Sequence, residues 1–433
     1  MKPINVGLIG LGTIGKGVYN ALANNGQLIA QRTGIVLKIN AVCDKDEAAL
    51  SLFPEEKGVI KTTSADELIN KKDIDIIVEL IGGIDPAKDI ILKSLNKKKH
   101  VVTANKAVLS KCWKEIFSAA LEKGMLVNFE ASVGGAIPII RTLRDSFVAN
   151  RINTIYGILN GTTNFILTEM GEKNCSFKDA LKIAQESGIA ESDPELDISG
   201  KDSAHKLAIL SLLSFGVDIS PENIYTEGIS GIEPQDIRNA ACCGYRVKLL
   251  AIAKSTDQGV EVRVHPTLIP LAHLLSDVKG ADNAVFVKGD LMGDALLFGK
   301  GAGSKPTASS VISDLVEIAG QVAFPSKKRP SLYKLDYAGE EKNLIQVEEL
   351  PMSCYLRFSV IDRPGVLAGI SSILSEHNIS IASVSQEERR EGETVPVIII
   401  THKAKEGDMR KAIAKIDARD YVSAPTVIIR IEE

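Results

Sequence analysis

Residues 4–15, INVGLIGLGTIG, decide how the chain begins to fold. Their first half is an apolar run typical of a buried strand, and a helical pattern follows it. The GxGxxG between the two suits a dinucleotide, because Gly10 permits the tight turn, Gly12 lets the backbone approach a pyrophosphate and Gly15 allows the helix to pack on the strand. The start of the helix would then offer unpaired amides to the phosphates. A purely structural glycine turn is the alternative.

The first third of the chain repeats this alternation of apolar runs and amphipathic helical patterns. Continuous apolar strands separated by helices indicate a parallel sheet covered on both faces, so we predict a doubly wound α/β domain. The predicted strands are residues 4–9, 35–43, 75–80, 100–103 and 125–129, and the predicted helices are residues 13–30, 86–98 and 108–123.

Asp44 closes the second predicted strand, where an acidic side chain would bind the ribose hydroxyls of NAD. It lies 34 positions beyond Gly10, later than the usual ~20, so the first helix or the loop after it must be long. Lys45 could instead receive the 2′-phosphate of NADP, and an ordinary loop aspartate is a third interpretation. The sequence leaves the choice between NAD and NADP open.

The composition excludes several classes of function. Lys and Arg number 51 and Asp and Glu 55, a formal net charge of −4, so no global positive field attracts nucleic acid. The six cysteines are sparse and show no CxxC spacing, which predicts reduced thiols in a cytoplasmic protein. The longest apolar helical stretch, residues 207–217, is about half the ~20 residues of a membrane span. The N-terminus leaves no room for a signal peptide before the first strand.

Two polar segments follow the predicted sheet. Residues 130–138, EASVGGAIP, expose carbonyls and a carboxylate, which suit an alkali or alkaline-earth cation, although an inter-domain turn explains them as well. Residues 160–164, NGTTN, follow a predicted strand over residues 152–159 and open a helix. They would present hydroxyls and amides to a small polar ligand, or simply cap the helix through Thr162 or Thr163.

The densest polar cluster is residues 188–206, GIAESDPELDISGKDSAHK. Asp202 and Lys206 are four positions apart and share one face if Asp202 opens the helix that follows. Because Lys206 precedes an apolar run, we expect it on a buried helix, where a lysine needs partners or a lowered pKa, as proton-transfer lysines do. Glu191, Asp197 and Asp202 could orient it and bind an ammonium group. A buried structural ion-pair network is the alternative.

This cluster resembles the signature of homoserine dehydrogenases, in which a glycine–hydrophobic–small stretch leads to D-P-x-x-D-hydrophobic-x-G-x-D-x-x-x-K. The chain matches the pattern at its fixed positions, which are Asp193, Pro194, Asp197, Ile198, Gly200, Asp202 and Lys206. Other segments agree, namely residues 102–106 (VTANK), 130–138, 160–164, and 301–303 (GAG) leading into 307–311 (TASSV). The resemblance spans about residues 4–325.

The resemblance implies NAD(P)-dependent interconversion of L-aspartate 4-semialdehyde and L-homoserine. Lys206 then resembles the proton donor to the carbonyl oxygen, with Asp202 beside it at the reaction centre. Glu191 resembles the residue that binds the substrate amino group, and Lys106 the second active-site lysine, near nicotinamide and substrate. The residues expected at the substrate are Glu191, Asp197, Lys106 and Thr162. Those expected at the cofactor are Gly10, Gly12, Thr13, Ile14, Gly15, Asp44, Thr103, Lys106 and Gly303.

The resemblance also implies a monovalent cation, with Na⁺ preferred, held mostly by backbone carbonyls at Glu130, Val133, Gly135 and Ile137. The family's middle domain pairs through its sheet, so we expect a homodimer or a homotetramer. A different class of function is a non-catalytic amino-acid sensor on the same scaffold, which should have lost polar site residues that this chain keeps. A dehydrogenase for another amino-acid aldehyde is a further alternative.

Residues 351–433 predict a separate module. Their order of expected elements, βαββαβ, is that of a ferredoxin-like unit. The first turn, residues 362–367 (DRPGVL), resembles the opening of ACT domains, which implies a regulatory amino-acid site that works by pairing with another copy. The same turn is also simply a good strand-to-helix connection. The residues expected at the effector, for which L-threonine is our hypothesis, are Asp362, Pro364, Gly365, Asn378 and Ile379.

Together these segments predict three α/β and α+β domains. The first is a dinucleotide-binding Rossmann domain over residues 1–130, with a return segment at about 303–325. Next come an α+β catalytic and dimerisation domain over 131–302, a linker over 326–350 and a ferredoxin-like ACT domain over 351–433. Nothing like an amino-acid kinase precedes Met1, so a bifunctional fusion is not expected, and neither is a membrane or nucleic-acid partner.

Overall fold

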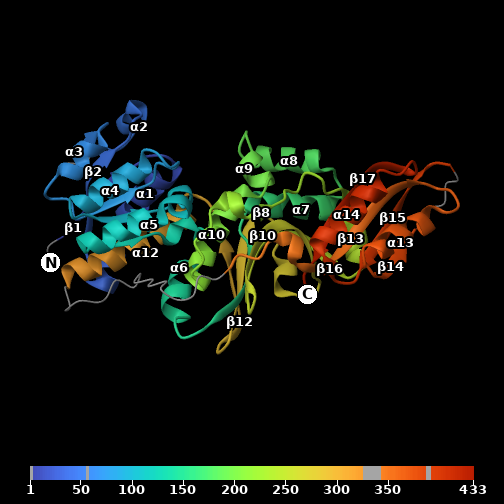
Figure 1. Ribbon diagram of the computed structural model, residues 1–433. Coiled ribbons are helices and arrows are strands. Elements are labelled where there is room, and N and C mark those ends of the chain that lie inside the picture. Colours follow the sequence, from blue (N-terminus) through green and yellow to red (C-terminus); the bar gives the residue numbers. More distant parts are fainter. Residues whose placement is uncertain (1–2, 55–57, 325–342, 387–391) are drawn as a thin grey trace.

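The computed structural model describes residues 3–54, 58–324, 343–386 and 392–433. Figure 1 shows them as three bodies in a row, coloured blue, green to yellow, and red in chain order. Helix α12 (Ser304–Ala323), in orange, returns to the first body after the chain has built the second. The molecule therefore has two junctions, one on each side of the middle body.

The first body is a six-stranded parallel sheet with helices on both faces, which confirms the predicted doubly wound α/β fold. The strand order is β3-β2-β1-β4-β5-β6. The strands are β1 (Ile4–Ile9), β2 (Leu37–Cys43), β3 (Ile60–Thr62), β4 (Ile76–Glu79), β5 (His100–Thr103) and β6 (Val127–Asn128). The helices are α1 (Thr13–Thr33), α2 (Glu47–Ser51), α3 (Ala65–Asn70), α4 (Ala87–Asn96), α5 (Lys106–Lys123) and the returning α12.

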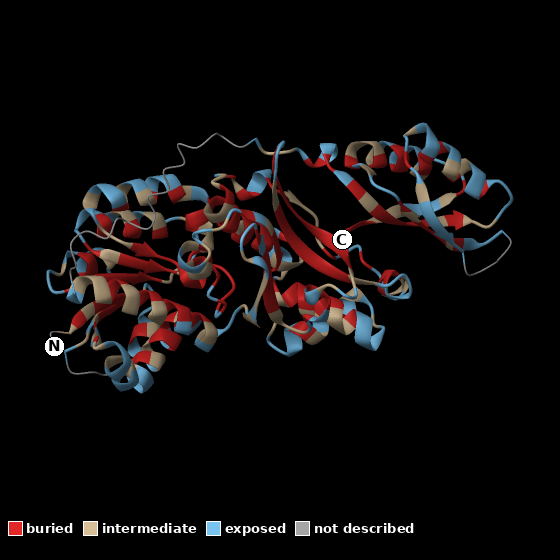
Figure 2. Cartoon of the chain, turned by 90° about the horizontal axis from the view of Figure 1, so that it is seen from below, coloured by how far each residue is buried: buried red, intermediate tan, exposed pale blue. Residues whose placement is uncertain are grey.

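The core of the first body has two sides, because strand residues alternate between sheet faces. Val6, Leu8 and Val78 are buried and pack with apolar residues of α1 and α12. Ile77 packs on the other face against α3, and Val101 packs there against α4 and α5. The strands are correspondingly buried in Figure 2. Both faces are covered, as the continuous apolar runs predict.

The structure adds one strand, β3, to the predicted set, at the sheet edge. Three residues are too few to show an apolar pattern, and Ile60 and Lys61 are not buried. Helix α1 is 21 residues long, which explains why Asp44 follows Gly10 so late in the sequence.

The middle body is an antiparallel sheet with helices packed mainly on one face. Its strands are β7 (Ile152–Ile158), β9 (Tyr245–Thr256), β10 (Gly259–Pro270), β11 (Asp282–Gly289) and β12 (Gly293–Lys300), in the order β12-β11-β7-β9-β10, with β8 (Tyr225–Thr226) beside β10. Its main helices are α7 (Gly161–Lys173), α8 (Phe177–Glu186), α9 (Glu195–Ile198), α10 (Lys201–Phe215) and α11 (Pro234–Cys242). Apolar residues of α10, including Leu207 and Leu210, are buried in the largest core of the described residues.

The third body has the predicted βαββαβ order. Its elements are β13 (Pro351–Ile361), α13 (Val366–Glu376), β14 (Ile381–Ser385), β15 (Thr394–Thr401), α14 (Glu406–Asp417) and β17 (Val422–Ile431), and a short β16 (Ala404–Lys405) pairs with β13. Residues 325–342, which include most of the predicted linker, and residues 387–391 lie outside the described residues.

The sheet of the third body continues into the sheet of the middle body. Strand β17 pairs in parallel with β10 at Thr267–Arg430 and Leu268–Ile431. The result is one 11-stranded sheet in the order β12-β11-β7-β9-β10-β17-β13-β15-β14. Two residue pairs between strands this distant in sequence leave no local pattern, so the sequence could not reveal the connection.

Candidate active site

Two lysines from different bodies share one buried carboxylate. Asp202 lies in the first turn of α10, and Lys206, one turn later, places Nζ 2.7 Å from Asp202 Oδ2. Lys106 is the first residue of α5, and its Nζ lies 2.7 Å from Asp202 Oδ1. Lys206 Nζ also donates to the backbone oxygen of Leu159, at the end of β7, at 2.6 Å. The predicted pair of Asp202 and Lys206 therefore forms, and Lys106 joins it across the first junction.

The charges in this cluster are strongly coupled. Burial opposes ionisation of Asp202, which is 3% exposed, but the charges and hydrogen bonds of Lys206 and Lys106 outweigh burial and hold its pKa well below the usual range. Burial lowers the pKa of Lys106, but the nearby carboxylates, Asp202 foremost, raise it overall. The cluster thus holds an ionised Asp202 between the side-chain nitrogens of two lysines.

The other predicted substrate residues surround this cluster. Asp197, on α9, accepts a hydrogen bond at 2.7 Å from Asn160, which also donates to Asp202. Glu191 is exposed, and the charge of its carboxylate contributes to the raised pKa of Lys106. Thr162 is buried in the first turn of α7, where its hydroxyl donates to Ile189 O at 3.2 Å. Thr162 therefore helps to anchor the chain that precedes Glu191.

The glycine-rich turn lines a cavity of about 660 Å³. Gly10 has φ of +98°, and a Cβ there would lie 2.7 Å from a backbone oxygen, while a Cβ on Gly15 would lie 1.9 Å from the oxygen of Gly10. Nothing lies within 4 Å of a Cβ built on Gly12. Close packing therefore requires the first and third glycines, whereas Gly12 leaves space at the start of α1. A pyrophosphate there would meet the first-turn amides of Thr13 and Ile14.

Asp44 and Lys45 line the same cavity. The carboxylate of Asp44 accepts hydrogen bonds from Leu11 N at 2.6 Å and from Asp46 N at 3.0 Å, so it also fixes the glycine-rich turn. Gly303, at φ +115°, brings the chain back beside this turn, where Ser304 Oγ donates to Thr13 O at 2.8 Å. The predicted cofactor residues of the first and last segments are thus neighbours.

Thr103 is held by a buried carboxylate that sequence reasoning missed. Its hydroxyl donates to Glu79 Oε2 at 2.6 Å, and the other Glu79 oxygen accepts from Ile81 N at 2.8 Å. Glu79 is fully buried, and burial raises its pKa. Asn105 accepts from Val108 N to cap α5, and so fixes the helix start that carries Lys106. A lone carboxylate ending an apolar strand was the available signal for Glu79.

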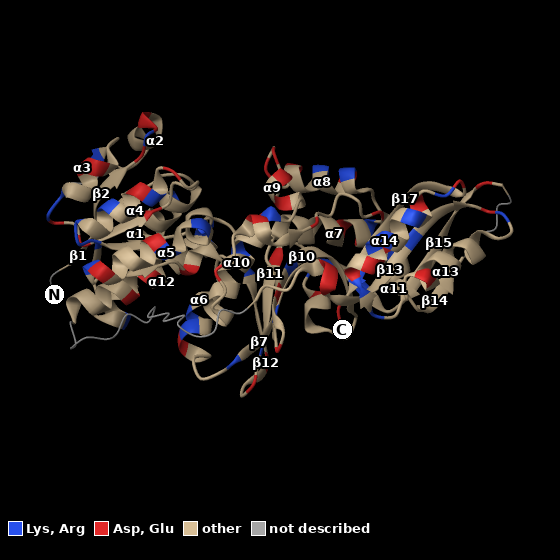
Figure 3. Cartoon of the chain, viewed as in Figure 1, with Lys and Arg blue, Asp and Glu red and all other residues tan. Residues whose placement is uncertain are grey.

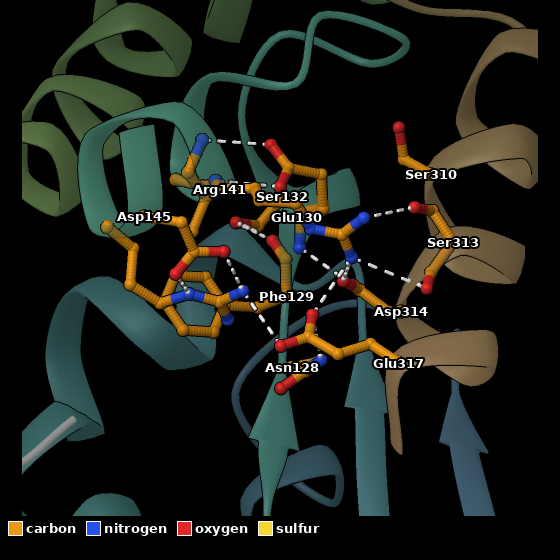
Figure 4. A network of polar contacts seen from close by, with 12 residues as sticks. Asn128, Phe129, Glu130, Ser132, Arg141, Asp145, Ser310, Ser313, Asp314 and Glu317 are labelled. Carbon is orange, nitrogen blue, oxygen red and sulfur yellow. Dashed lines mark hydrogen bonds and ion pairs between the residues drawn. The ribbon is translucent and has the colours of Figure 1, made fainter. Parts of the chain in front are cut away.

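Residues 130–138 connect the first body to the second through a polar network (Figure 4). The carboxylate of Glu130 accepts the amides of Ile140 and Arg141, each at 2.8 Å, and Glu130 N donates to Asp314 on α12 at 2.8 Å. The guanidinium of Arg141 pairs with Glu317, also on α12, at 2.9 Å. Burial raises the pKa of Glu130 and of Asp314. The network ties the loop, α6 (Ile139–Arg141) and α12 together.

The same loop contains the four predicted cation residues, Glu130, Val133, Gly135 and Ile137. The side chain of Glu130 is committed to the backbone amides, so a cation here would be held by carbonyl oxygens, as the family pattern implies. Gly135 O accepts from Ser310 Oγ at 2.7 Å and Ile137 O from Ile139 N at 2.8 Å, and each carbonyl keeps a second lone pair. Val133 and Gly135 are buried. These oxygen donors are the type that an alkali cation takes.

The predicted effector residues lie at the two ends of α13. Pro364 and Gly365 are exposed at its start, and Asn378 (φ +57°) and the buried Ile379 follow its end. A helix of 11 residues separates the two sets by about 16 Å. Within one chain the structure therefore does not bring them together around a small amino acid. Asp362 lies with the first set.

Three further observations on the described residues concern a histidine base, a metal site and a membrane span. The imidazole of His205 lies 2.8 Å from Ser110 Oγ, so it has a local partner. No group of three or more His, Cys, Asp or Glu side chains is arranged to hold a metal ion in these parts of the chain. None of the helices that the structure describes is long and apolar enough to cross a bilayer.

Known proteins resemble this chain over its full length. A relative from Neisseria gonorrhoeae, named homoserine dehydrogenase, is 43% identical over 433 residues, covering 100% of this chain and 99% of that protein. The chain belongs to the homoserine dehydrogenase family. A homoserine dehydrogenase from Pseudomonas aeruginosa is 43% identical over 437 residues and covers 100% of both chains.

Family models divide the chain in the same way. Homoserine dehydrogenase matches residues 138–316, its NAD-binding domain residues 10–130 and the ACT domain residues 355–418. The crystal structure of a homoserine dehydrogenase from Thiobacillus denitrificans superposes with a TM-score of 0.92 at 44% identity, covering 100% of this chain and 99% of that one. A hyperthermophilic archaeal homoserine dehydrogenase in complex with NADPH has a TM-score of 0.63 at 25% identity, over 76% of this chain and 100% of that one. The predicted family, fold class and oxidoreductase activity are confirmed.

Proposed function

We propose that this chain interconverts L-homoserine and L-aspartate 4-semialdehyde with NAD or NADP, and that Lys206 transfers the proton. The observation that carries the proposal is the carboxylate of Asp202, which both Lys106 and Lys206 approach to 2.7 Å. A structural ion pair needs one lysine for one carboxylate. Two lysines that converge on one carboxylate instead place ammonium donors where an oxygen becomes negative during the reaction.

Lys206 has the geometry of a proton donor. An ammonium has three N–H donors, and Lys206 directs two of them to Asp202 and to Leu159 O. Both contacts fix the direction of the third, which would meet the carbonyl oxygen of the aldehyde. The nicotinamide, when bound, supplies the hydride to the aldehyde carbon or accepts it from the alcohol. In homoserine oxidation Lys206 must act as a base, so alkaline pH should favour that direction.

The surrounding carboxylates would bind the substrate ammonium. Glu191 and Asp197 lie close to the lysine cluster and are partly or fully exposed, so a substrate can reach them. Lys106, with 32% of its side chain exposed, would contact both nicotinamide and substrate. Thr162 then contributes by holding the chain before Glu191.

The adenosine end of the cavity accommodates NAD and NADP in different ways. Asp44 would accept the ribose hydroxyls of NAD, whereas Lys45 would pair with the 2′-phosphate of NADP. Both residues line the cavity, so the proposal includes both cofactors.

A monovalent cation, Na⁺ for preference, would bind the carbonyls of Glu130, Val133, Gly135 and Ile137. A rise in thermal midpoint in NaCl relative to choline chloride would support that site, and equal midpoints would contradict it.

We further propose that residues 351–433 regulate the enzyme by binding an amino acid, with L-threonine as the first candidate. Because the two sets of effector residues lie at opposite ends of α13, one ligand would touch both only where two copies pair. A homodimer or homotetramer in the cytoplasm fits this arrangement. A threonine titration that changes neither rate nor thermal stability would refute this regulation.

The domain boundaries that we propose are residues 1–130 with about 303–325, 131–302, a linker over 326–350, and 351–433.

The test of the function is the initial rate of NAD and NADP reduction by L-homoserine at alkaline pH. We expect activity in the parent chain and a loss of about 10²–10⁴-fold in Lys206→Ala. Lys201→Ala is the matched control, because Lys201 is an exposed lysine in the first turn of the same helix. A well-folded parent that is inactive with both cofactors in both directions would refute the proposal.

A further inference from the structure

Asn160 joins the two carboxylates of the candidate site. It follows β7, is 5% exposed and caps α7, and its Nδ2 donates to Asp197 Oδ1 at 2.7 Å and to Asp202 Oδ2 at 2.9 Å. Sequence reasoning treated residues 160–164 as a possible ligand site or a cap and did not single out Asn160. Asn160 lies at the start of α7, Asp197 on α9 and Asp202 on α10, so the fold brings the three residues together.

The amide of Asn160 has only one favourable orientation. Its Oδ1 accepts from Thr163 N at 2.9 Å and from Thr163 Oγ1 at 3.1 Å. An amide offers two N–H donors and an oxygen with two lone pairs, so all of these are used. A flipped amide would place its oxygen against Asp197 and Asp202. The side chain is therefore a fixed bridge from the start of α7 to both acids.

The helix start does not require asparagine. Serine and aspartate cap helices about as well, since each accepts the same backbone amide. Neither can donate two hydrogen bonds to a pair of ionised carboxylates at neutral pH. What asparagine adds at this position is the pair of donors toward Asp197 and Asp202.

We infer that Asn160 is a positioning residue for the reaction: its amide sets the orientation of Asp202, and so of the lysines that share it, relative to Asp197. This inference rests on the proposed function. The preceding residue, Leu159, holds Lys206 through its backbone oxygen. One two-residue turn therefore fixes the proton-transfer lysine, its carboxylate and the carboxylate expected at the substrate ammonium. A displacement of about 1 Å at such a site can cost about 10²-fold in rate.

Asn160→Ser is the variant that separates capping from positioning, because serine keeps the cap and adds no charge. We expect its dissociation constant for NADPH to match the parent and its thermal midpoint to fall only slightly, by the loss of two hydrogen bonds. Its kcat for L-homoserine should fall and its KM rise, so that kcat/KM falls by about 10–100-fold. Ser176→Ala is the control: Ser176 caps the neighbouring α8 by accepting from Asp179 N, away from the cluster, and its kcat and KM should be parental.

The double variant Asn160→Ser with Asp197→Asn supplies a second readout. If Asn160 acts through Asp197, the double variant should lose less than the product of the two single losses. Two outcomes would overturn the inference. One is parental kcat and KM in Asn160→Ser. The other is a loss of kcat at unchanged KM that follows a lowered thermal midpoint. An inactive parent chain would instead refute the proposed function, so the two failures are distinguishable.

Discussion

The middle body carries two buried clusters of charge, one at each junction, and they are built differently. At the first junction two lysines share Asp202, and 32% of the Lys106 side chain is exposed. At the second junction Arg263 and Lys254 pair with Glu432 and Glu261, so cations and carboxylates are equal in number. The ribbon in Figure 3 is coloured for charged residues around α10 and again where β13, α14 and β17 meet.

The second cluster has two fully buried arginines at its centre. Arg263 is 1% exposed and Arg430, which pairs with Glu406 at 2.6 Å, is 2% exposed. Burial and the charge of Arg263 hold the pKa of His265 well below its usual range, so it adds no charge. The comparison teaches that a buried charge by itself does not mark a reaction centre. The first cluster differs in that two lysines converge on one carboxylate, whereas in the second two cations pair with two carboxylates and the cluster joins two bodies.

The largest expected effect is on catalysis at the first cluster. Lys206→Met should lower kcat by about 10²–10⁴-fold, because the proton donor is removed. Asp202 keeps Lys106 and Asn160 as partners, so no charge is stranded and the thermal midpoint should stay near the parental value. Steady-state kinetics and thermal unfolding of the same preparation measure both. A large fall in the midpoint would mean that this cluster is structural too.

The converse effect is expected at the second cluster. Glu432→Gln removes a charged partner of Arg263 and should destabilise the protein by about 3–5 kcal/mol, while kcat of the folded enzyme stays parental. Glu172→Gln is the matched control, because Glu172 pairs with Lys279 on the surface at 2.9 Å and should cost less than about 1 kcal/mol. Denaturant unfolding measures the difference. Equal losses in the two variants would contradict the distinction between the clusters.

Acid should reduce the stability that the second cluster provides, over a defined pH range. Burial alone would raise the pKa of Glu432, but the charges of Arg263 and Lys254 outweigh burial and lower it from 4.5 to about 2. The folded state therefore binds fewer protons than the unfolded state between these values. The stabilisation is complete above the unfolded pKa and is lost as pH falls toward about 2, a total of about 3 kcal/mol. Between pH 6 and pH 2 the free energy of unfolding should therefore fall by about 3 kcal/mol less in Glu432→Gln than in the parent.

A smaller effect is expected from a neutral neighbour of the same cluster. Tyr156 donates to Glu432 Oε2 at 3.0 Å from β7. Tyr156→Phe removes that hydrogen bond but no charge, so it should cost about 1 kcal/mol in denaturant unfolding. A loss as large as that of Glu432→Gln would show that the cluster depends on hydrogen bonding more than on charge.

Sequence patterns predicted the features that depend on residues close together in the chain. The GxGxxG lies where strand meets helix, and the four-residue spacing of Asp202 and Lys206 places both on one helix face. Lys106 could not be added from local rules, because only the packing of α5 against α10 brings it to Asp202; the family resemblance supplied it. Asn160 was hidden because a capping role already explained it.

The second cluster was missed for a related reason. Arg430 and Glu432 alternate with the apolar Ile429 and Ile431 at the end of the chain, which is the ordinary pattern of a half-exposed strand. Only the pairing of β17 with β10 brings Arg430 and Glu432 against the charged residues of the middle body. Long-range strand pairing therefore decides which charges are buried, and a single sequence does not contain it.

The most direct test of the account is chemical rescue of Lys206→Ala by small primary amines during L-homoserine oxidation. If the missing group is the proton acceptor, the initial rate should rise with free-amine concentration and, among amines of similar size, with amine basicity. Lys201→Ala, which lacks an exposed lysine of the same helix, should not respond. A Lys206→Ala variant with the parental rate, or a rescue that ignores amine basicity, would contradict the assignment of proton transfer to Lys206.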